Sequence, residues 1–166
     1  MTIELESQQR DETASTSDIA AVVSLRLLAA ATSLAAAVVV ITNHQQRWGI
    51  RVDFTLFQVW IAFVAMNLGC FLYAAATAAA ARRLAGKGWL HNADQLVVNL
   101  EAAATAGAGA VGSIAMWGNE ASGWYAVCRM YRRYCNAGLA ALVLSFAAVL
   151  FLGFASVRSR YPKKIN

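Results

Sequence analysis

The sequence has few charged residues, one proline and three cysteines. Charged residues make up 14% of the 166 residues, against about a quarter in an average soluble domain. Hydrophobic residues make up 59%, which together with the low charge argues against a soluble globular domain. The single proline, Pro162, lies almost at the C-terminus, so proline kinks are not expected in any helix before it.

Long stretches of the chain contain no acidic residue, lysine or arginine. These stretches are 27–46, 54–81, 102–119 and 136–157. A helix that crosses a bilayer needs about 20 mostly apolar residues, and its backbone polar groups must be satisfied within the helix. When one or two intramembrane charges are allowed, the sequence predicts an all-α integral membrane bundle of four transmembrane helices. The predicted spans are 19–42, 54–81, 95–117 and 137–157, within one domain over 19–160.

Both ends of the chain are polar. Residues 1–18 hold one basic and five acidic residues, whereas a secretory signal peptide begins with basic residues. Such a segment buries too little apolar area to become ordered, so the sequence predicts a disordered cytosolic tail over 1–18. Residues 161–166 are predicted to be a basic cytosolic tail. Position 2 is not glycine and no cysteine lies near the C-terminus, so a lipid anchor is not expected.

The distribution of lysine and arginine predicts the orientation of the bundle. Basic residues favour the cytosolic side of a membrane protein. If both termini are cytosolic, eight of the fourteen basic residues lie in cytosolic segments, five lie in outer loops, and Arg26 lies within a span. The sequence therefore predicts cytosolic termini. The net charge of +5 then reflects topology and contact with lipid headgroups, so no nucleic-acid partner is expected.

The C-terminal residues allow two interpretations. Lys163 and Lys164 match the dilysine signal for retrieval from the Golgi to the endoplasmic reticulum, but they also belong to a basic cluster that follows the fourth span. Such a cluster holds the terminus in the cytosol and contacts anionic lipid. We favour the basic anchor, because Lys163 lies only six residues after Val157 and a retrieval signal must extend away from the membrane.

Three ionisable residues lie within or at the edge of the predicted spans: Arg26, Asp94 and Glu101. Charged groups in hydrocarbon are costly, so they are usually paired or functional. Arg26 lies at a depth between the two acids, and Asp94 and Glu101 are seven residues apart, which places them on nearly the same helix face. The sequence predicts that Arg26 pairs with Asp94, either as a pair or as a triad that shares Glu101, fixing the register of two helices. A proton or ion pathway through these acids is the alternative.

The third predicted span is rich in alanine and glycine. Ala104, Ala108 and Gly112 recur at four-residue spacing. The first span offers a similar set in Ala29, Ser33 and Ala37. Small residues at this spacing let helix backbones approach closely in a membrane. We therefore expect Ala104, Ala108 and Gly112 to form a helix-packing surface, either within one chain or between chains.

Cys128 and Cys135 lie in the second outer loop, where oxidising surroundings favour a disulfide. In one continuous helix they would lie about 10 Å apart, which is too far for a disulfide, so the pairing requires a turn between them. Thiol oxidoreductases use closer pairs such as Cys-x-x-Cys, so a thiol-redox enzyme is the less favoured interpretation. Cys70, in the second span, is expected to be a small buried apolar residue.

The sequence contains no recognisable catalytic, cofactor-binding or metal-binding motif. His44 and His91 lie in different loops and have no cysteine or histidine at ligand spacing. No glycine-rich phosphate-binding loop and no nucleophile elbow occurs. We therefore expect no enzyme activity, no cofactor and no metal ion, and the sequence identifies no small-molecule substrate.

Several of these features resemble the plant Casparian strip membrane proteins and their CASP-like relatives, which are related to the MARVEL group of four-helix membrane proteins. The similarity extends over 19–160 and consists of an arginine in the first span, an aspartate that opens the third, and an outer loop with two cysteines among aromatic residues. In this sequence these are Arg26, Asp94, Gly118-Asn119, Trp124-Tyr125, Cys128, Tyr131, Tyr134 and Cys135.

The resemblance implies a non-enzymatic plasma-membrane protein with cytosolic termini that forms homo- and hetero-oligomers with family members. Casparian strip members assemble immobile membrane platforms that guide local cell-wall modification. Their first outer loop carries a stretch beginning Glu-Thr-Leu-Pro, which residues 43–51 lack, so the resemblance favours a CASP-like relative. The expected function is a self-associating scaffold that organises membrane domains. A small ion or solute transporter, or a channel subunit, that uses Asp94 and Glu101 is the alternative.

Overall fold

The computed structural model of the chain describes residues 2–84 and 87–160, with side chains described over 16–84 and 87–159. Four long helices dominate the fold: α1 (Thr2–Thr42), α2 (Gln58–Ala79), α4 (Gly88–Trp117) and α5 (Arg132–Arg160). The segments long and apolar enough to cross a membrane are Thr16–Thr42, Gln58–Ala79, Gly88–Trp117 and Arg132–Ser159. The prediction of an all-α bundle with four transmembrane helices is therefore confirmed.

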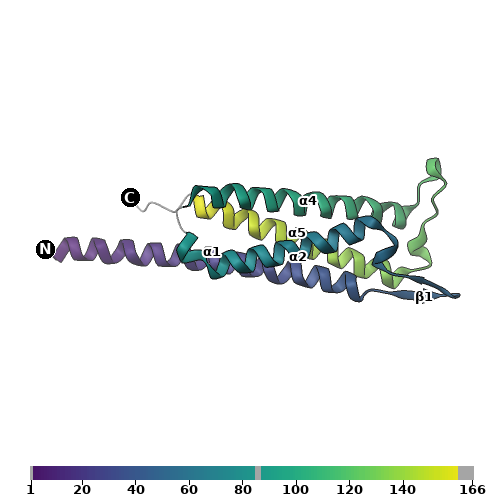
Figure 1. Cartoon of the computed structure of the whole chain (residues 1–166), viewed down its shortest axis with the longest axis horizontal. Coiled ribbons are helices and arrows are strands. Elements are labelled where there is room, and N and C mark those ends of the chain that lie inside the picture. The colour runs from purple at the N-terminus through teal and green to yellow at the C-terminus, as the bar shows by residue number, and fades with distance from the viewer. Residues whose placement is uncertain (1, 85–86, 161–166) are drawn as a thin grey trace.

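The helices lie side by side with alternating direction, as Figure 1 shows. α1 packs on α5 and α2, and α4 packs on α5 and, less extensively, on α2. The short helix α3 (Ala81–Leu84) follows α2 near the end of the bundle that carries both termini. The connections α1–α2 and α4–α5 lie at the opposite end. The topology therefore gathers both outer loops at one end of the molecule.

The predicted disordered tail over 1–18 was wrong, because α1 extends back to Thr2. The purple part of α1 projects past the other helices in Figure 1. Glutamate, glutamine and arginine are good helix formers, and a helix already nucleated by an apolar span extends at little cost. This extension forms without burying apolar area, so low hydrophobicity does not prevent it. The predicted basic tail over 161–166, with Lys163 and Lys164, lies outside the described residues.

Two helices begin at residues other than the predicted ones, and local capping accounts for the first. Asp53 accepts a hydrogen bond from the backbone N–H of Thr55 at 3.0 Å and begins a 3₁₀ turn, η1 (Phe54–Leu56), so α2 starts at Gln58 and not at residue 54. α4 starts at Gly88, seven residues earlier than the predicted 95, and its first turn buries Leu90. α4 therefore carries Asp94 inside its second turn and not at its first residue.

The first outer loop is a two-stranded hairpin formed by β1 (Gln45–Arg47) and β2 (Ile50–Val52). Its two turn residues, Trp48 and Gly49, have φ of 49° and 81°. Positive φ at both central residues matches the right-handed twist of a hairpin. The second outer loop contains two single-turn helices, η2 (Glu120–Ser122) and η3 (Val127–Arg129).

Small residues form much of the contact between the helices, while large apolar residues cover the outside. In α1, Ala29, Ser33 and Ala37 are fully buried. Of the predicted packing set in α4, Ala108 is fully buried in the core, and Ala104 and Gly112 are half-buried. Large side chains that face outward belong in lipid, and include Leu72, Val143 and Phe154. Small residues between the helices and large apolar residues on the outside are expected where close backbone approach holds helices together.

Candidate functional site

The first buried polar cluster centres on Arg26 of α1 and Asp94 of α4. The guanidinium donates from Nη1 to Asp94 Oδ1 at 3.0 Å and from Nη2 to Asp94 Oδ2 at 2.6 Å. Both side chains are essentially inaccessible, with exposures of 1% and 0%. A two-bond fork of this kind is the strongest geometry for an arginine–carboxylate pair. The structure therefore joins two of the three ionisable residues that the sequence singled out.

Residues of α2 complete this cluster. Arg26 Nη1 also donates to the Thr77 hydroxyl at 2.7 Å, and the Tyr73 hydroxyl donates to Asp94 Oδ1 at 2.6 Å. Thr77 in turn donates to the backbone carbonyl of Tyr73 at 2.8 Å. Both charges thus have neutral hydrogen-bond partners as well as each other, which offsets part of their desolvation. Sequence reasoning missed Tyr73 and Thr77, although their four-residue spacing already places them on one helix face.

The predicted triad, in which Arg26 shares Glu101, was wrong. The Glu101 carboxylate Oε1 lies 2.8 Å from the Ser145 hydroxyl of α5, and its Oε2 has no hydrogen-bond partner among the described residues. Seven residues of helix rise by about 10 Å, so an arginine that grips Asp94 with both nitrogens does not reach the next acid on the same face. Glu101 belongs instead to a second cluster, one level further into the bundle.

The second buried cluster joins α2, α4 and α5. The Asn67 amide donates from Nδ2 to the Ser145 hydroxyl at 3.2 Å, and the Thr105 hydroxyl lies 2.7 Å from the same oxygen. Asn67, Glu101 and Ser145 are all fully buried. Ser33 Oγ of α1 and Asn67 Oδ1 have no hydrogen-bond partner among the described residues, as for Glu101 Oε2. This cluster has no arginine or lysine in it, in contrast to the first.

Cys128 and Cys135 form a disulfide in the structure, with their Cα atoms 5.7 Å apart. η3 ends at Arg129 and α5 begins at Arg132, so the chain turns between the two cysteines. That turn meets the geometric condition set by their spacing. Cys70 is a free, buried thiol in α2. The arrangement can brace the outer loop at the start of α5.

Hydrogen bonds tie the two outer loops to each other. Asn43 donates from Nδ2 to the backbone carbonyl of Tyr134 at 2.8 Å, and the N–H of Tyr134 donates to Gln45 Oε1 at 3.1 Å. Arg47 donates from Nη1 to the carbonyl of Met130 at 2.9 Å. Nothing in the sequence pattern pairs these loops. Each contact joins a side chain to a backbone group that is 83 to 91 residues away in the sequence.

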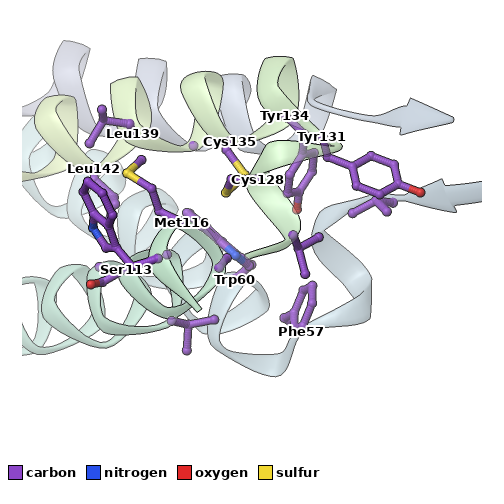
Figure 2. A pocket seen from close by; sticks show the side chains of 18 of the residues that line it. Phe57, Trp60, Ser113, Met116, Cys128, Tyr131, Tyr134, Cys135, Leu139 and Leu142 are labelled. Atoms are coloured by element: carbon purple, nitrogen blue, oxygen red, sulfur yellow. A yellow bond between two sulfur atoms is a disulfide. The ribbon is translucent and has the colours of Figure 1, made fainter. Parts of the chain in front are cut away.

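An apolar cavity of about 430 Å³ lies beneath these loops, between the end of α4 and the starts of α2 and α5. In Figure 2 the disulfide forms part of its wall, with Met116 on one side and Tyr131 and Tyr134 on the other. Trp60 contributes a ring from α2, and Ser113 is one of its few polar lining residues. Sequence reasoning missed this cavity, since its walls come from three helices and a loop.

The described residues contain no group of three histidine, cysteine, aspartate or glutamate side chains that could hold a metal ion. His91 Nδ1 lies 3.0 Å from the Ser156 hydroxyl of α5, and His44 Nδ1 lies 3.0 Å from the carbonyl of Thr42. Both histidines therefore contact neighbouring helix groups. The two buried polar clusters can hold the four helices in one register.

Comparison with known proteins places the chain among plant membrane proteins. The family model described as the Casparian strip membrane protein domain matches residues 15–151. "CASP-like protein UU1" of Oryza sativa subsp. indica is 78% identical over 161 residues, covering 97% of this chain and 96% of that protein. "CASP-like protein UU-1" of Oryza sativa subsp. japonica is 80% identical over 162 residues, with coverage of 97% and 96%.

A more distant relative carries the name of the family itself. "Casparian strip membrane protein 1" of Cucumis melo is 40% identical over 57 residues, covering 34% of this chain and 27% of that protein. No solved structure matches the chain.

Proposed function

Because the chain belongs to the Casparian strip membrane protein domain family and, within it, to the CASP-like proteins of plants, we propose that it is a self-associating scaffold of the plasma membrane. Its partners would be further copies of itself and related family members. Its role would be to organise membrane domains, including those linked to cell-wall modification, without enzyme activity of its own.

The observation that carries this proposal is the uncovered face of α4. Within the apolar stretch of α4 only 11% is buried inside the chain, compared with 33% or more for the other three spanning helices. The exposed residues Ala103, Ala106, Ala110 and Ser113 follow one another at three- and four-residue spacing. Small side chains on a lipid-facing helix let a second helix approach closely. This stripe therefore suits contact with another chain.

The two sides of α4 thus have separate roles in the proposal. Ala108 faces the core of its own bundle and is fully buried, whereas Ala106 and Ala110 face outward. The internal surface sets how α4 sits in one chain, and the external stripe sets how chains meet. A rigid bundle supports such contacts, because the Arg26–Asp94 pair fixes α4 relative to α1.

The orientation in the membrane follows from chemistry at the two ends. The disulfide between Cys128 and Cys135 lies at the start of α5, and this helix starts at the end of the bundle opposite the start of α1. Disulfides form and persist in oxidising compartments. This supports an outward-facing loop end and cytosolic termini. In the proposal the basic residues after α5 anchor the cytosolic end at anionic headgroups.

The test enlarges small residues on the α4 stripe. Ala106→Leu and Ala110→Leu should reduce energy transfer between labelled chains in lipid vesicles and speed the lateral diffusion of a fluorescent fusion in plant plasma membrane. Ala140→Leu is the matched control, because Ala140 is equally small and exposed but lies on α5. Unchanged energy transfer in both α4 variants, with free diffusion of the wild-type protein, would contradict the proposal.

Two other functions predict different results. A transporter or channel subunit would give ion or solute flux in reconstituted vesicles that depends on Asp94 and Glu101. A thiol-redox enzyme would give turnover that depends on Cys128 and Cys135. Location is tested separately: Lys163→Ser with Lys164→Ser should leave the protein at the cell surface, whereas movement from internal membranes to the surface would reveal an active retrieval signal.

A further inference from the structure

The cluster around Glu101 lies near the middle of every helix that contributes to it. Asn67 is central in α2, Glu101 and Thr105 are central in α4, and Ser145 is central in α5. In a spanning bundle these positions lie near the middle of the bilayer, where water is scarce and each polar group needs a partner within the protein. Here the number of hydrogens available to the cluster can be counted.

The Thr105 hydroxyl has one hydrogen and two close oxygen neighbours. It donates to the backbone carbonyl of Glu101 at 2.8 Å, because a carbonyl oxygen only accepts. The contact of 2.7 Å between Thr105 and Ser145 then needs the hydrogen of Ser145. Asn67 offers no further hydrogen, since its Nδ2 already donates to the Phe63 carbonyl at 2.9 Å and to Ser145 at 3.2 Å.

The contact between Ser145 and Glu101 is therefore left without a hydrogen if the carboxyl is ionised. Ser145 Oγ lies 2.8 Å from Glu101 Oε1, which is a hydrogen-bond distance, and a serine hydroxyl has only one hydrogen to donate. Three oxygen–oxygen contacts would share two hydrogens. Each contact has its own hydrogen when the carboxyl group carries a third hydrogen. Glu101 then donates to Ser145, Ser145 donates to Thr105, and Thr105 donates to the Glu101 carbonyl.

The surroundings of Glu101 supply no cation in place of that hydrogen. Glu101 contacts Ser145 of α5, and Ser145 in turn contacts Asn67 of α2 and Thr105 of α4. The Cys70 thiol of α2 lies within electrostatic range of Glu101. The arginine of the first span, Arg26, is held by both carboxylate oxygens of Asp94. A carboxylate buried without a partner takes up a proton to avoid the cost of a bare charge.

We infer that Glu101 is a proton-binding site at the centre of the bundle, where the neutral carboxylic acid donates from Oε1 to Ser145. Neutrality also explains why Glu101 Oε2 can remain without a partner among the described residues: an unpaired carbonyl-type oxygen costs much less than an unpaired carboxylate oxygen. The proton closes a hydrogen-bond ring that holds α4 on α5, with α2 attached through Asn67.

This proton site is independent of the proposed scaffold role. It would exist in a single chain, so a failure of self-association leaves it standing, and a charged Glu101 leaves the α4 stripe unchanged. The inference also separates the two intramembrane acids. Asp94 is paired with Arg26 through two hydrogen bonds, whereas Glu101 is kept as an acid by its lack of a cation.

The first test compares the same chemical change at both acids in lipid nanodiscs. Glu101→Gln keeps a donor to Ser145, because the amide N–H replaces the acid O–H, so its melting temperature should stay within about 2 °C of wild type. Asp94→Asn is the matched control: it removes the charge that Arg26 needs and should lower the melting temperature by about 6 °C or more. An equal fall in both variants would overturn the inference.

The second test needs no mutation. Infrared spectra of the wild-type protein at pH 7 should contain the carbonyl stretch of a protonated carboxylic acid. Labelling glutamate with ¹³C should move that band to lower wavenumber, and labelling aspartate should leave it in place. The band should be absent from Glu101→Gln. Absence of a glutamate-sensitive band from the wild-type spectrum would show that the carboxyl is ionised and the inference wrong.

Discussion

The two ends of the bundle are held together by different means. At the end that carries the termini, charged side chains join the helices, with the buried Arg26–Asp94 pair and an exposed contact of 3.2 Å between Arg158 and Asp18. At the opposite end a disulfide and side-chain hydrogen bonds to backbone groups join two loops above an apolar cavity. Each end uses the chemistry that its surroundings permit.

The difference has a physical origin. Helices inside hydrocarbon have no exposed backbone groups to offer each other, so polar contacts there must come from side chains, and a charged one must be neutralised. Loops that leave the membrane have free N–H and C=O groups to offer, and in the proposed orientation they face an oxidising environment, which favours covalent closure. Substitutions at the two ends test whether the ion pair stabilises its end of the bundle more than the disulfide stabilises the opposite end.

The largest effect is expected for Arg26→Leu or Asp94→Leu. Each leaves the remaining charge buried without its partner, which should lower the free energy of unfolding by about 3–5 kcal/mol. The double change removes both charges and should restore part of the loss. Denaturant titration in detergent measures the free energy of unfolding of all three variants. If the double variant shows only the sum of the two single losses, the two residues do not act as a pair.

Opening the disulfide should have a smaller effect. Cys128→Ser with Cys135→Ser frees a short loop, whose closure contributes about 2–3 kcal/mol in the loop-entropy description. Cys70→Ser is not a matched control, because Cys70 is buried; reduction of the wild-type protein is the better one. Mass spectrometry under non-reducing conditions should find the two thiols linked. A loss larger than that of the ion-pair variants would reverse the comparison between the ends.

Single hydrogen bonds at the two ends can be compared directly. Tyr73→Phe removes a bond of 2.6 Å to the charged Asp94 and should cost about 2 kcal/mol, since bonds to charged groups are the stronger ones. Asn43→Ala removes a bond of 2.8 Å to the neutral carbonyl of Tyr134 and should cost about 1 kcal/mol. Equal losses in detergent unfolding would mean that the charge on Asp94 adds nothing.

The smallest effect is expected at Asp53 in the first outer loop. Hydrogen bonds from Thr55, above all from its side chain, hold the pKa of Asp53 below its ordinary 3.8. A lowered pKa in the folded state means that ionised Asp53 contributes stability above pH 3.8, and that this contribution is lost as the pH falls through the lowered value. Thr55→Ala should raise the pKa toward 3.8, as followed by NMR of the carboxyl carbon. A pKa that does not move would assign the shift to Arg51 and not to Thr55.

The membrane fold could be predicted from the sequence because hydrocarbon leaves the chain few choices. A stretch such as 136–157, with no acid, lysine or arginine, must satisfy its backbone within a helix. The same reasoning linked Arg26 to Asp94, since matched depth and opposite charge are both legible in one dimension. For Cys128 and Cys135 the sequence predicted only that a disulfide between them requires a turn. It did not predict the geometry of that turn.

Only the tertiary structure decided which neighbour each remaining polar group received. Asp94 and Glu101 lie on one helix face by sequence, and the sequence left open whether Glu101 shares Arg26; the structure gives Arg26 to Asp94 and Ser145 to Glu101. That outcome depends on the rise of α4 and on which helix passes each level, and hydropathy carries no information on either. The extension of α1 to Thr2 was likewise invisible to an argument about burial. Composition determines that a segment crosses the membrane, whereas the contacts between segments depend on rotation and register, which arise only when the helices pack.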